Sequence, residues 1–149
     1  MKNLKPLLLV ICILSYNIIY SQESKKSQTD VEMITETLMH YIDGTANGQP
    51  DRLKKAFHPD FNLYTIQNDS VRIRDGQKYI SLFKPGKKAN RVGRIISIDF
   101  VKDAASAKAE IIMPGWRVYT DYFLLMKYQG SWKIIQKSYT FRPIPKSKE

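Results

Sequence analysis

The chain has 149 residues, with 24 lysine and arginine residues against 14 aspartate and glutamate residues and a formal net charge of +10. A positive balance of this size favours weak contact with anionic surfaces. The single cysteine, Cys12, excludes a disulfide within the chain and a metal site built from several cysteines.

The amino end has the three parts of a secretory signal peptide. Lys2 and Lys5 form a short positive segment, residues 7–14 are apolar, and Ser21 is a small residue at the expected cleavage point. The apolar run is shorter than the ~20 residues that a membrane-spanning helix needs. We therefore expect residues 1–21 to be a signal peptide and the protein to be exported, to the periplasm or the extracellular space. An exported chain is not expected to bind nucleic acid.

The remainder of the chain is expected to form one domain over residues 29–142. Residues 22–28 are predicted to be a disordered leader, and residues 143–149 a polar tail. Thr29 and Glu32 match the capping box that begins a helix. Apolar residues then recur at helical spacing and predict one buried face. They are Val31, Ile34, Leu38, Tyr41 and Ile42.

Two further helices are predicted after the first, which is expected to fray between Gly44 and Gly48. Pro50 favours the start of the second helix. His58-Pro59 should end it, because the residue before a proline avoids helical geometry. A third helix is predicted over Gly76–Phe83, so that about three helices lie in the amino-terminal part of the domain.

Alternating apolar residues predict strands in the rest of the chain. A hairpin is expected over Phe61–Ile66 and Val71–Arg74, and a turn is expected over Asp103–Ser106. The other strands are expected over residues 95–101, 107–113, 116–128 and 132–141. Helices followed by an antiparallel sheet indicate the α+β class.

The segment Trp116–Tyr128 is apolar on both faces. One face carries Trp116, Val118, Tyr122, Leu124 and Met126, and the other carries Tyr119, Phe123 and Leu125. A strand of this kind is expected at the centre of a sheet, with helices over one face. We expect a second copy of the chain to cover the other face, in a homodimer.

Four segments carry a resemblance to a known family. They are Tyr41–Gly44, Leu53–Asp60, Tyr119–Lys127 and Trp132–Lys137. From Val31 to Phe141 the chain resembles the nuclear transport factor 2-like superfamily, with its ketosteroid isomerase and SnoaL-like proteins, and within it the putative lumazine-binding group. The resemblance implies a cystatin-like cone, in which helices pack on a curved antiparallel sheet and hold a small hydrophobic or aromatic molecule. It does not fix an activity, because this fold hosts enzymes and binding proteins alike. No cofactor is expected, because the sequence has neither a Walker loop nor a dinucleotide glycine fingerprint.

Ketosteroid isomerase supplies the alternative to a binding protein. The resemblance places its oxyanion tyrosine at Tyr41, its oxyanion aspartic acid at Asp121 and its base at Thr65. Tyr41 and Asp121 would then be the oxyanion donors of an isomerase or dehydratase. A threonine cannot take a proton from carbon at neutral pH, so the pattern leans away from an enzyme.

Asp121 and Tyr41 each have a second interpretation. Asp121 shares a strand face with apolar residues, and burial would raise its pKa and keep it partly protonated. The alternative is a structural carboxylate paired with Arg117, two residues back on the same face. Tyr41 lies on the apolar face of the first helix, where a tyrosine either belongs to the core or lines a pocket.

Aromatic side chains on the predicted strands could stack against a flat ligand, or could serve only the core and a dimer interface. The candidate ligand-binding residues are Tyr41, Trp116, Tyr119, Asp121, Phe123 and Tyr139. The basic loop from Lys84 to Arg94 either is simply solvated or binds an anionic partner. No metal site is expected, because His58-Pro59-Asp60 offers only two ligands.

Overall fold

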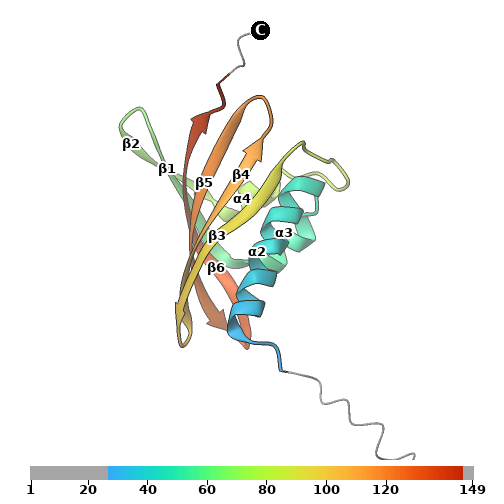
Figure 1. Ribbon diagram of the computed structural model, residues 1–149, viewed down its shortest axis with the longest axis vertical. Coiled ribbons are helices and arrows are strands. Elements are labelled where there is room, and N and C mark those ends of the chain that lie inside the picture. Colours follow the sequence, from blue (N-terminus) through green and yellow to red (C-terminus); the bar gives the residue numbers. More distant parts are fainter. Residues whose placement is uncertain (1–26, 146–149) are drawn as a thin grey trace, which may run out of the picture.

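A computed structural model describes residues 27–145. The expected signal peptide, most of the expected leader and tail residues 146–149 lie outside the described residues. Helix α2 covers Asp30–Asn47, α3 covers Pro50–Ala56 and α4 covers Gly76–Ile80. Figure 1 shows α2 and α3 side by side against one face of a curved sheet. Within residues 27–145, no helix is long and apolar enough to cross a membrane.

Six strands form the sheet, in the order β2-β1-β6-β5-β4-β3. They are β1 (Phe57–Gln67), β2 (Ser70–Asp75), β3 (Val92–Val101), β4 (Ala104–Met113), β5 (Arg117–Tyr128) and β6 (Ser131–Pro143). Neighbours are antiparallel except β1 and β6, which run parallel. Strand β1 enters the sheet from a helix rather than from a hairpin, so no tight turn forces it to oppose β6. The predicted α+β architecture, three helices on a curved sheet, is confirmed.

Helix α2 has the predicted capping box. The Glu32 amide donates to the Thr29 hydroxyl, and the Glu32 carboxylate accepts a 2.8 Å hydrogen bond from the Thr29 amide. At the other end, Gly48 adopts a left-handed conformation with φ of 58° and caps the helix. The helix therefore runs through Gly44 and ends in one defined step instead of fraying.

Strand β1 begins earlier than predicted. The second helix ends at Ala56, and β1 starts at Phe57 rather than Phe61. Pro59 has no amide hydrogen to donate, and the pairing of β1 with β6 is irregular between Phe57 and Asn62, where the proline lies. The helix does end before His58-Pro59, as expected, but the strand begins before the proline instead of after it, because an irregular strand accommodates Pro59.

Three other boundaries differ from the prediction. Helix α4 ends at Ile80, and the chain continues in turns through Phe83. Strand β3 begins at Val92, inside the segment predicted as a basic loop. Lys102 takes a left-handed conformation in a short turn, so β4 begins at Ala104 instead of three residues later.

Strand β5 has one buried face and, beyond the buried Val118, one exposed face in the single chain. Asp121, Phe123 and Leu125 point to the helices and are almost fully buried. Tyr122, Leu124 and Met126 alternate with them and are 48%, 47% and 43% exposed. The sequence analysis expected both faces of β5 to be covered. In the single chain only the face toward α2 is covered.

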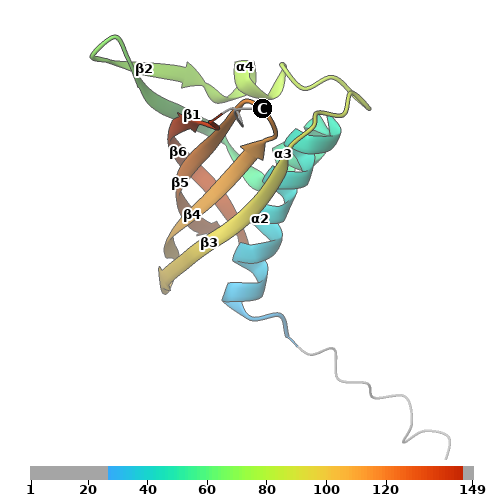
Figure 2. The same ribbon diagram turned by 45° about the horizontal axis from the view of Figure 1, so that its top comes forward.

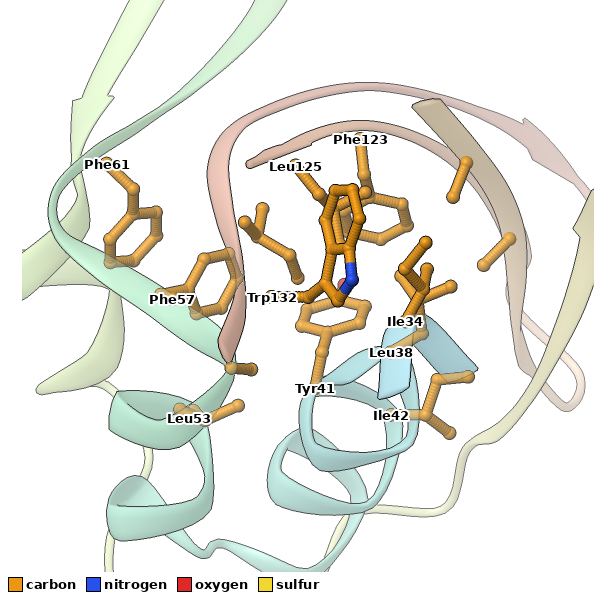
Figure 3. Close-up of a cluster of buried hydrophobic side chains, with 14 of the residues drawn as sticks. Ile34, Leu38, Tyr41, Ile42, Leu53, Phe57, Phe61, Phe123, Leu125 and Trp132 are labelled. Carbon is orange, nitrogen blue, oxygen red and sulfur yellow. The ribbon is translucent and has the colours of Figure 1, made fainter. Parts of the chain in front are cut away.

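The two ends of the cone differ in their contents. The closed end lies at the start of α2 and consists of the buried residues Ile34, Leu38, Leu125, Trp132 and Ile134. Figure 3 shows Trp132 projecting between Leu125 of β5 and the α2 residues Ile34 and Leu38. Its indole nitrogen donates a 2.8 Å hydrogen bond to Asp30 at the edge, and the buried Thr37 hydroxyl donates to the Trp132 carbonyl, so the closed end is apolar apart from satisfied hydrogen bonds. The open end lies at the far end of α2, beside α4 and the segment that follows it (Figure 2).

Candidate functional site

A cavity of about 420 Å³ occupies the open end of the cone. Its wall comes from the last turns of α2, from α4, from the segment after α4 and from the inner face of β4, β5 and β6. Of the six candidate ligand-binding residues, five line this cavity: Tyr41, Trp116, Tyr119, Asp121 and Tyr139. The sixth, Phe123, is only 1% exposed and packs against the Tyr41 ring in the core below.

Three polar side chains meet at the floor of the cavity, and we call them the buried cluster: Tyr41, Asp121 and Lys137. The Tyr41 hydroxyl donates to Asp121 Oδ2 at 2.6 Å. Lys137 Nζ donates to Asp121 Oδ1 at 2.9 Å and to the Tyr41 hydroxyl at 3.0 Å. Asp121 is fully buried and Lys137 is 4% exposed, so the ion pair is shielded from bulk water.

Burial and charge act on the buried cluster together. Burial by itself disfavours the Lys137 ammonium, but Asp121 together with the neighbouring tyrosines Tyr79 and Tyr139 outweighs it, so the pKa of Lys137 lies above its ordinary value. Burial, followed by the negative charge of Asp121, raises the pKa of Tyr41 well above its ordinary value. Lys137 is therefore a cation and Tyr41 a neutral hydroxyl at physiological pH.

The hydrogen-bond directions decide what the buried cluster can offer a ligand. Both Asp121 oxygens already accept hydrogen bonds, and the one hydroxyl proton of Tyr41 goes to Asp121. The ammonium of Lys137 has three hydrogens, of which Asp121 and Tyr41 take two. The hydrogen-bond donor that remains for a group in the cavity is therefore on Lys137. It is not on Tyr41 or Asp121, the two donors that the resemblance to ketosteroid isomerase implies.

Asp121 is a paired carboxylate, but the alternative that named Arg117 as its partner is wrong. The Arg117 guanidinium lies 3.6 Å from the centroid of the Trp116 ring and 4.2 Å from that of Phe141. Lys137, from the neighbouring strand, supplies the charge instead. Cation–π contacts with these two aromatic rings stabilise the charge of the flat guanidinium.

Aromatic rings form much of the cavity wall. Tyr119 and Tyr139 lie on neighbouring strands with their ring centroids 6.1 Å apart. On the opposite side, Tyr79 of α4 contacts Phe83 edge to face, at 5.1 Å between centroids. Lys137 Nζ lies 4.7 Å from the Tyr139 ring centroid and 5.6 Å from that of Tyr79. A flat apolar molecule between these rings would have aromatic contacts on both sides and a cation below.

The basic segment, residues 84–91, forms the rim of the cavity and is anchored to the end of α2. The Gly86 amide donates to the Gly48 carbonyl at 3.0 Å, and the Ala89 amide donates to the Ala46 carbonyl at 2.7 Å. A side chain at Gly48 would collide with the Lys84 and Lys87 carbonyls, so only glycine allows this approach. The anchoring brings Lys84, Lys87 and Arg91 to the cavity wall.

Thr65 lies outside this cavity. It lines a neighbouring hollow of about 400 Å³ beside β2, together with Gln67, Arg72 and Lys78. The two hollows share Arg74 and Tyr139. The residue at the isomerase base position is therefore separated from the buried cluster, in a hollow walled mostly by polar side chains of β2 and α4.

Lys137 and Tyr79 are the site residues that the sequence interpretation missed. Lys137 alternates with Tyr139 in β6, and this inward position was the available signal for a buried lysine. Tyr79 lies in a helix that the sequence predicted, but its direction depends on how α4 packs against β1. Among residues 27–145, no group of three His, Cys, Asp or Glu side chains is placed to hold a metal ion.

The comparisons with known proteins agree with the fold. The model of the family described as "Putative lumazine-binding" matches residues 29–140. An NTF2-like protein of unknown function from Shewanella baltica has 23% identity and a TM-score of 0.68, covering 79% of this chain and 100% of its own. A second one, from Methylobacillus flagellatus, has 28% identity and a TM-score of 0.67, covering 79% and 96%.

A protein named Aldolase FrzH, from Cladobotryum sp, is 21% identical over 119 residues, which cover 78% of this chain and 95% of that protein. A domain of unknown function from Nostoc punctiforme, described as having a cystatin-like fold, has 18% identity and a TM-score of 0.56, covering 76% and 78%. The resemblance to the nuclear transport factor 2-like superfamily is confirmed. The chain belongs to the Putative lumazine-binding family.

Proposed function

We propose that this member of the Putative lumazine-binding family binds a small, flat aromatic molecule in the cavity at its open end. The observation that carries the proposal is the cavity itself: about 420 Å³, walled by aromatic rings and floored by a buried, charged hydrogen-bond donor. A mostly apolar cavity with a few placed polar groups is the usual form of a small-molecule site. The family description agrees, because lumazine is a flat bicyclic heterocycle.

Analysis of molecules released from the purified protein tests this proposal. The wild-type chain is denatured after purification, and the small molecules are identified by mass spectrometry. Ala89→Phe fills the mouth of the cavity, whereas Ala104→Phe places the same side chain at an exposed position of β4. We expect aromatic molecules from the wild type and from Ala104→Phe, and much less from Ala89→Phe. Equal recovery from both variants, or none from the wild type, would contradict the proposal.

The second candidate function is catalysis on a carbonyl compound, which the similarity to a protein named an aldolase favours. Aldol and isomerase reactions pass through an enolate, and a fixed cation beside its oxygen would stabilise it. Lys137 lines the cavity and would supply this cation with its remaining hydrogen. Binding without reaction is the leading proposal, because Asp121 is the one carboxylate on the wall among residues 27–145, and both its oxygens are already bonded.

Proton exchange at carbon separates the two functions. 2-Tetralone, a bicyclic aromatic ketone, is incubated with the protein in deuterium oxide, and the loss of its α-protons is followed by NMR. Enolate stabilisation predicts exchange that is faster with the wild type than with the variant Lys137→Met. Equal exchange rates with the two proteins and with buffer would exclude this second candidate.

We also propose that the chain forms a homodimer through the outer face of β5. Tyr122, Leu124 and Met126 project side by side from this face and are each more than 40% exposed. A second copy offers the same apolar strip, so the contact is self-complementary. Light scattering should give the mass of two chains for the wild type and of one chain for Leu124→Lys. Val101→Lys, at the end of edge strand β3, is the control and should stay dimeric; a monomeric wild type would overturn the dimer.

Export is the remaining part of the proposed function. The motive is the composition of residues 1–21, which lie outside the described residues. Expression of the full chain in a bacterium with a periplasm should yield a periplasmic protein whose first residue is Gln22. Recovery of the unprocessed chain from the cytoplasm would contradict export. Weak contact with anionic surfaces stays a prediction of the net charge.

A further inference from the structure

The charge on the cavity wall is strongly unbalanced. Five cationic side chains line the cavity, against one carboxylate, that of Asp121. Asp121 is already paired with Lys137 on the floor. The other four cations are Arg74, Lys84, Lys87 and Arg91. A concave site with walls of one charge sign concentrates its field inward and attracts ligands of the opposite sign.

These four cations have no acidic partners of their own. Within residues 27–145, no carboxylate lies within 4.0 Å of any of them. Among residues 27–145, three of the five arginines outside the cavity do pair with carboxylates. Arg52 lies 2.8 Å from Asp43, and Arg94 and Arg142 lie 2.6 Å and 3.5 Å from Glu110. Within the described part of the chain, carboxylates therefore neutralise some arginines, but none pairs with a cation at the rim of the cavity.

Arg91 is the member of this set that most needs an acceptor. Its Nε is buried and has no hydrogen-bond partner among residues 27–145. Its guanidinium carbon lies 5.9 Å from the centroid of the Phe83 ring, beside the aromatic wall. A buried donor without an acceptor is costly, and a hydrogen bond between charged groups is stronger than a neutral one.

The backbone holds this set in place before any ligand arrives. The two hydrogen bonds from Gly86 and Ala89 to the end of α2 fix the segment that carries Lys84, Lys87 and Arg91. Because the backbone of this segment is already ordered, a ligand need not order it on binding, and more of the attraction is retained as affinity.

We infer that the ligand is an aromatic anion, with its ring between the aromatic walls and its carboxylate or phosphate group at Arg91. The inference rests on the proposed binding function and names the chemical class of the ligand. Lys84, Lys87 and Arg74 attract the anion to the mouth of the cavity. Arg91 lines the cavity and supplies the directional hydrogen bond from its guanidinium.

Calorimetric titration of matched probes tests the inference on the full-length chain. The probes are 2-naphthoate, 2-naphthyl phosphate and 2-naphthamide, which share one ring system and differ in the charged group. We expect either or both anions to bind at least about tenfold more tightly than the amide, as one charged hydrogen bond allows. Their relative affinities tell a carboxylate site from a phosphate site. Affinity for the anions should fall as sodium chloride is added.

Two variants with the same change of charge localise the effect. Arg91→Gln should weaken binding of the better anion about tenfold and leave the affinity for the amide unchanged. Arg94→Gln, three residues along the chain and paired with Glu110, should leave both affinities within about twofold. Circular dichroism melting confirms that both variants are folded.

The outcomes separate this inference from the function on which it rests. Equal affinity for the amide and both anions, or equal losses in Arg91→Gln and Arg94→Gln, would overturn the anion while leaving the aromatic cavity in place. Binding of none of the three probes to the wild type would overturn both.

Discussion

The closed end and the open end of the cone are built from the same helix and the same strands but are stabilised in different ways. At the closed end, Leu125 and Trp132 pack against Ile34 and Leu38, and each buried side chain adds to stability by leaving water. At the open end, Asp121 and Lys137 are equally buried, but each is tolerated only because the other compensates its charge.

The difference indicates that the closed end stabilises the fold and that the open end forms the site. An apolar core at the open end would have served stability at least as well, because buried ion pairs gain little over hydrophobic packing. A charged pair with one hydrogen left over, beneath a cavity, suits a ligand instead. Residues 119, 121, 123 and 125 show the change along one strand face, from an aromatic wall through a charged floor to an apolar core.

The largest expected effect is that of Asp121→Ala. The change leaves the Lys137 ammonium buried without its carboxylate, and removing one partner of a buried pair costs about 3–5 kcal/mol of unfolding free energy. Urea denaturation measures the loss.

The triple variant Tyr41→Phe, Asp121→Val and Lys137→Met is the control for Asp121→Ala, because it removes the whole buried cluster and leaves no polar group behind. Its stability should lie within about 1 kcal/mol of the wild type, or above it. A triple variant that is as unstable as Asp121→Ala would mean that the buried cluster holds the open end together, contrary to the comparison.

The next effect is that of Leu125→Ala at the closed end. The smaller side chain leaves a void beside Trp132, and such changes cost about 2–5 kcal/mol. Leu125 has no charge partner, so, unlike the loss in Asp121→Ala, this loss of stability cannot be restored by substituting a partner as well. Urea denaturation gives the size of the effect, and titration with 2-naphthoate should give an unchanged affinity for the folded protein. If Leu125→Ala lost its affinity for 2-naphthoate but kept the stability of the wild type, the assignment of stability to the closed end and binding to the open end would be contradicted.

The smallest effect is a loss of stability in alkaline solution. The pKa values of Lys137 and Tyr41 lie above their ordinary values in the folded chain, so the folded state holds these protons more tightly than the unfolded state. Their contribution is complete below about pH 10 and is lost as the pH rises through the folded pKa values, by at most about 1.4 kcal/mol per pH unit for each group. Urea denaturation between pH 8 and 11 should show the decline in the wild type and in Leu125→Ala, and a shallower one in the triple variant. Parallel curves for all three proteins would contradict it.

The sequence predicted the fold well where local rules decide it. Thr29 and Glu32 fixed the start of α2, and alternation identified every strand. The parallel pairing of β1 with β6 was not predictable in this way, because it depends on where two helices deliver the chain. The start of β1 at Phe57 was missed for a related reason: pairing with Ile134 extends the strand past a proline that local rules treat as a boundary.

The site was predicted only in part. Tyr41 and Asp121 were singled out, and they do meet, at 2.6 Å. Lys137 was missed because a lysine is expected at the surface unless a buried partner for its charge is known. That partner, Asp121, lies on another strand. The basic segment was interpreted as a loop that is solvated or binds an anion, and its anchoring to α2 places three of its cations at the cavity. Contacts between distant segments, not local patterns, create this site.

A crystal structure of the protein soaked with 2-naphthoate tests the central claim most directly, namely that the open end is a ligand site. We predict a naphthalene ring between Tyr119 and Tyr139 on one side and Phe83 on the other, with its carboxylate at Arg91. An empty cavity, or a naphthoate bound instead at the outer face of β5, would contradict the claim.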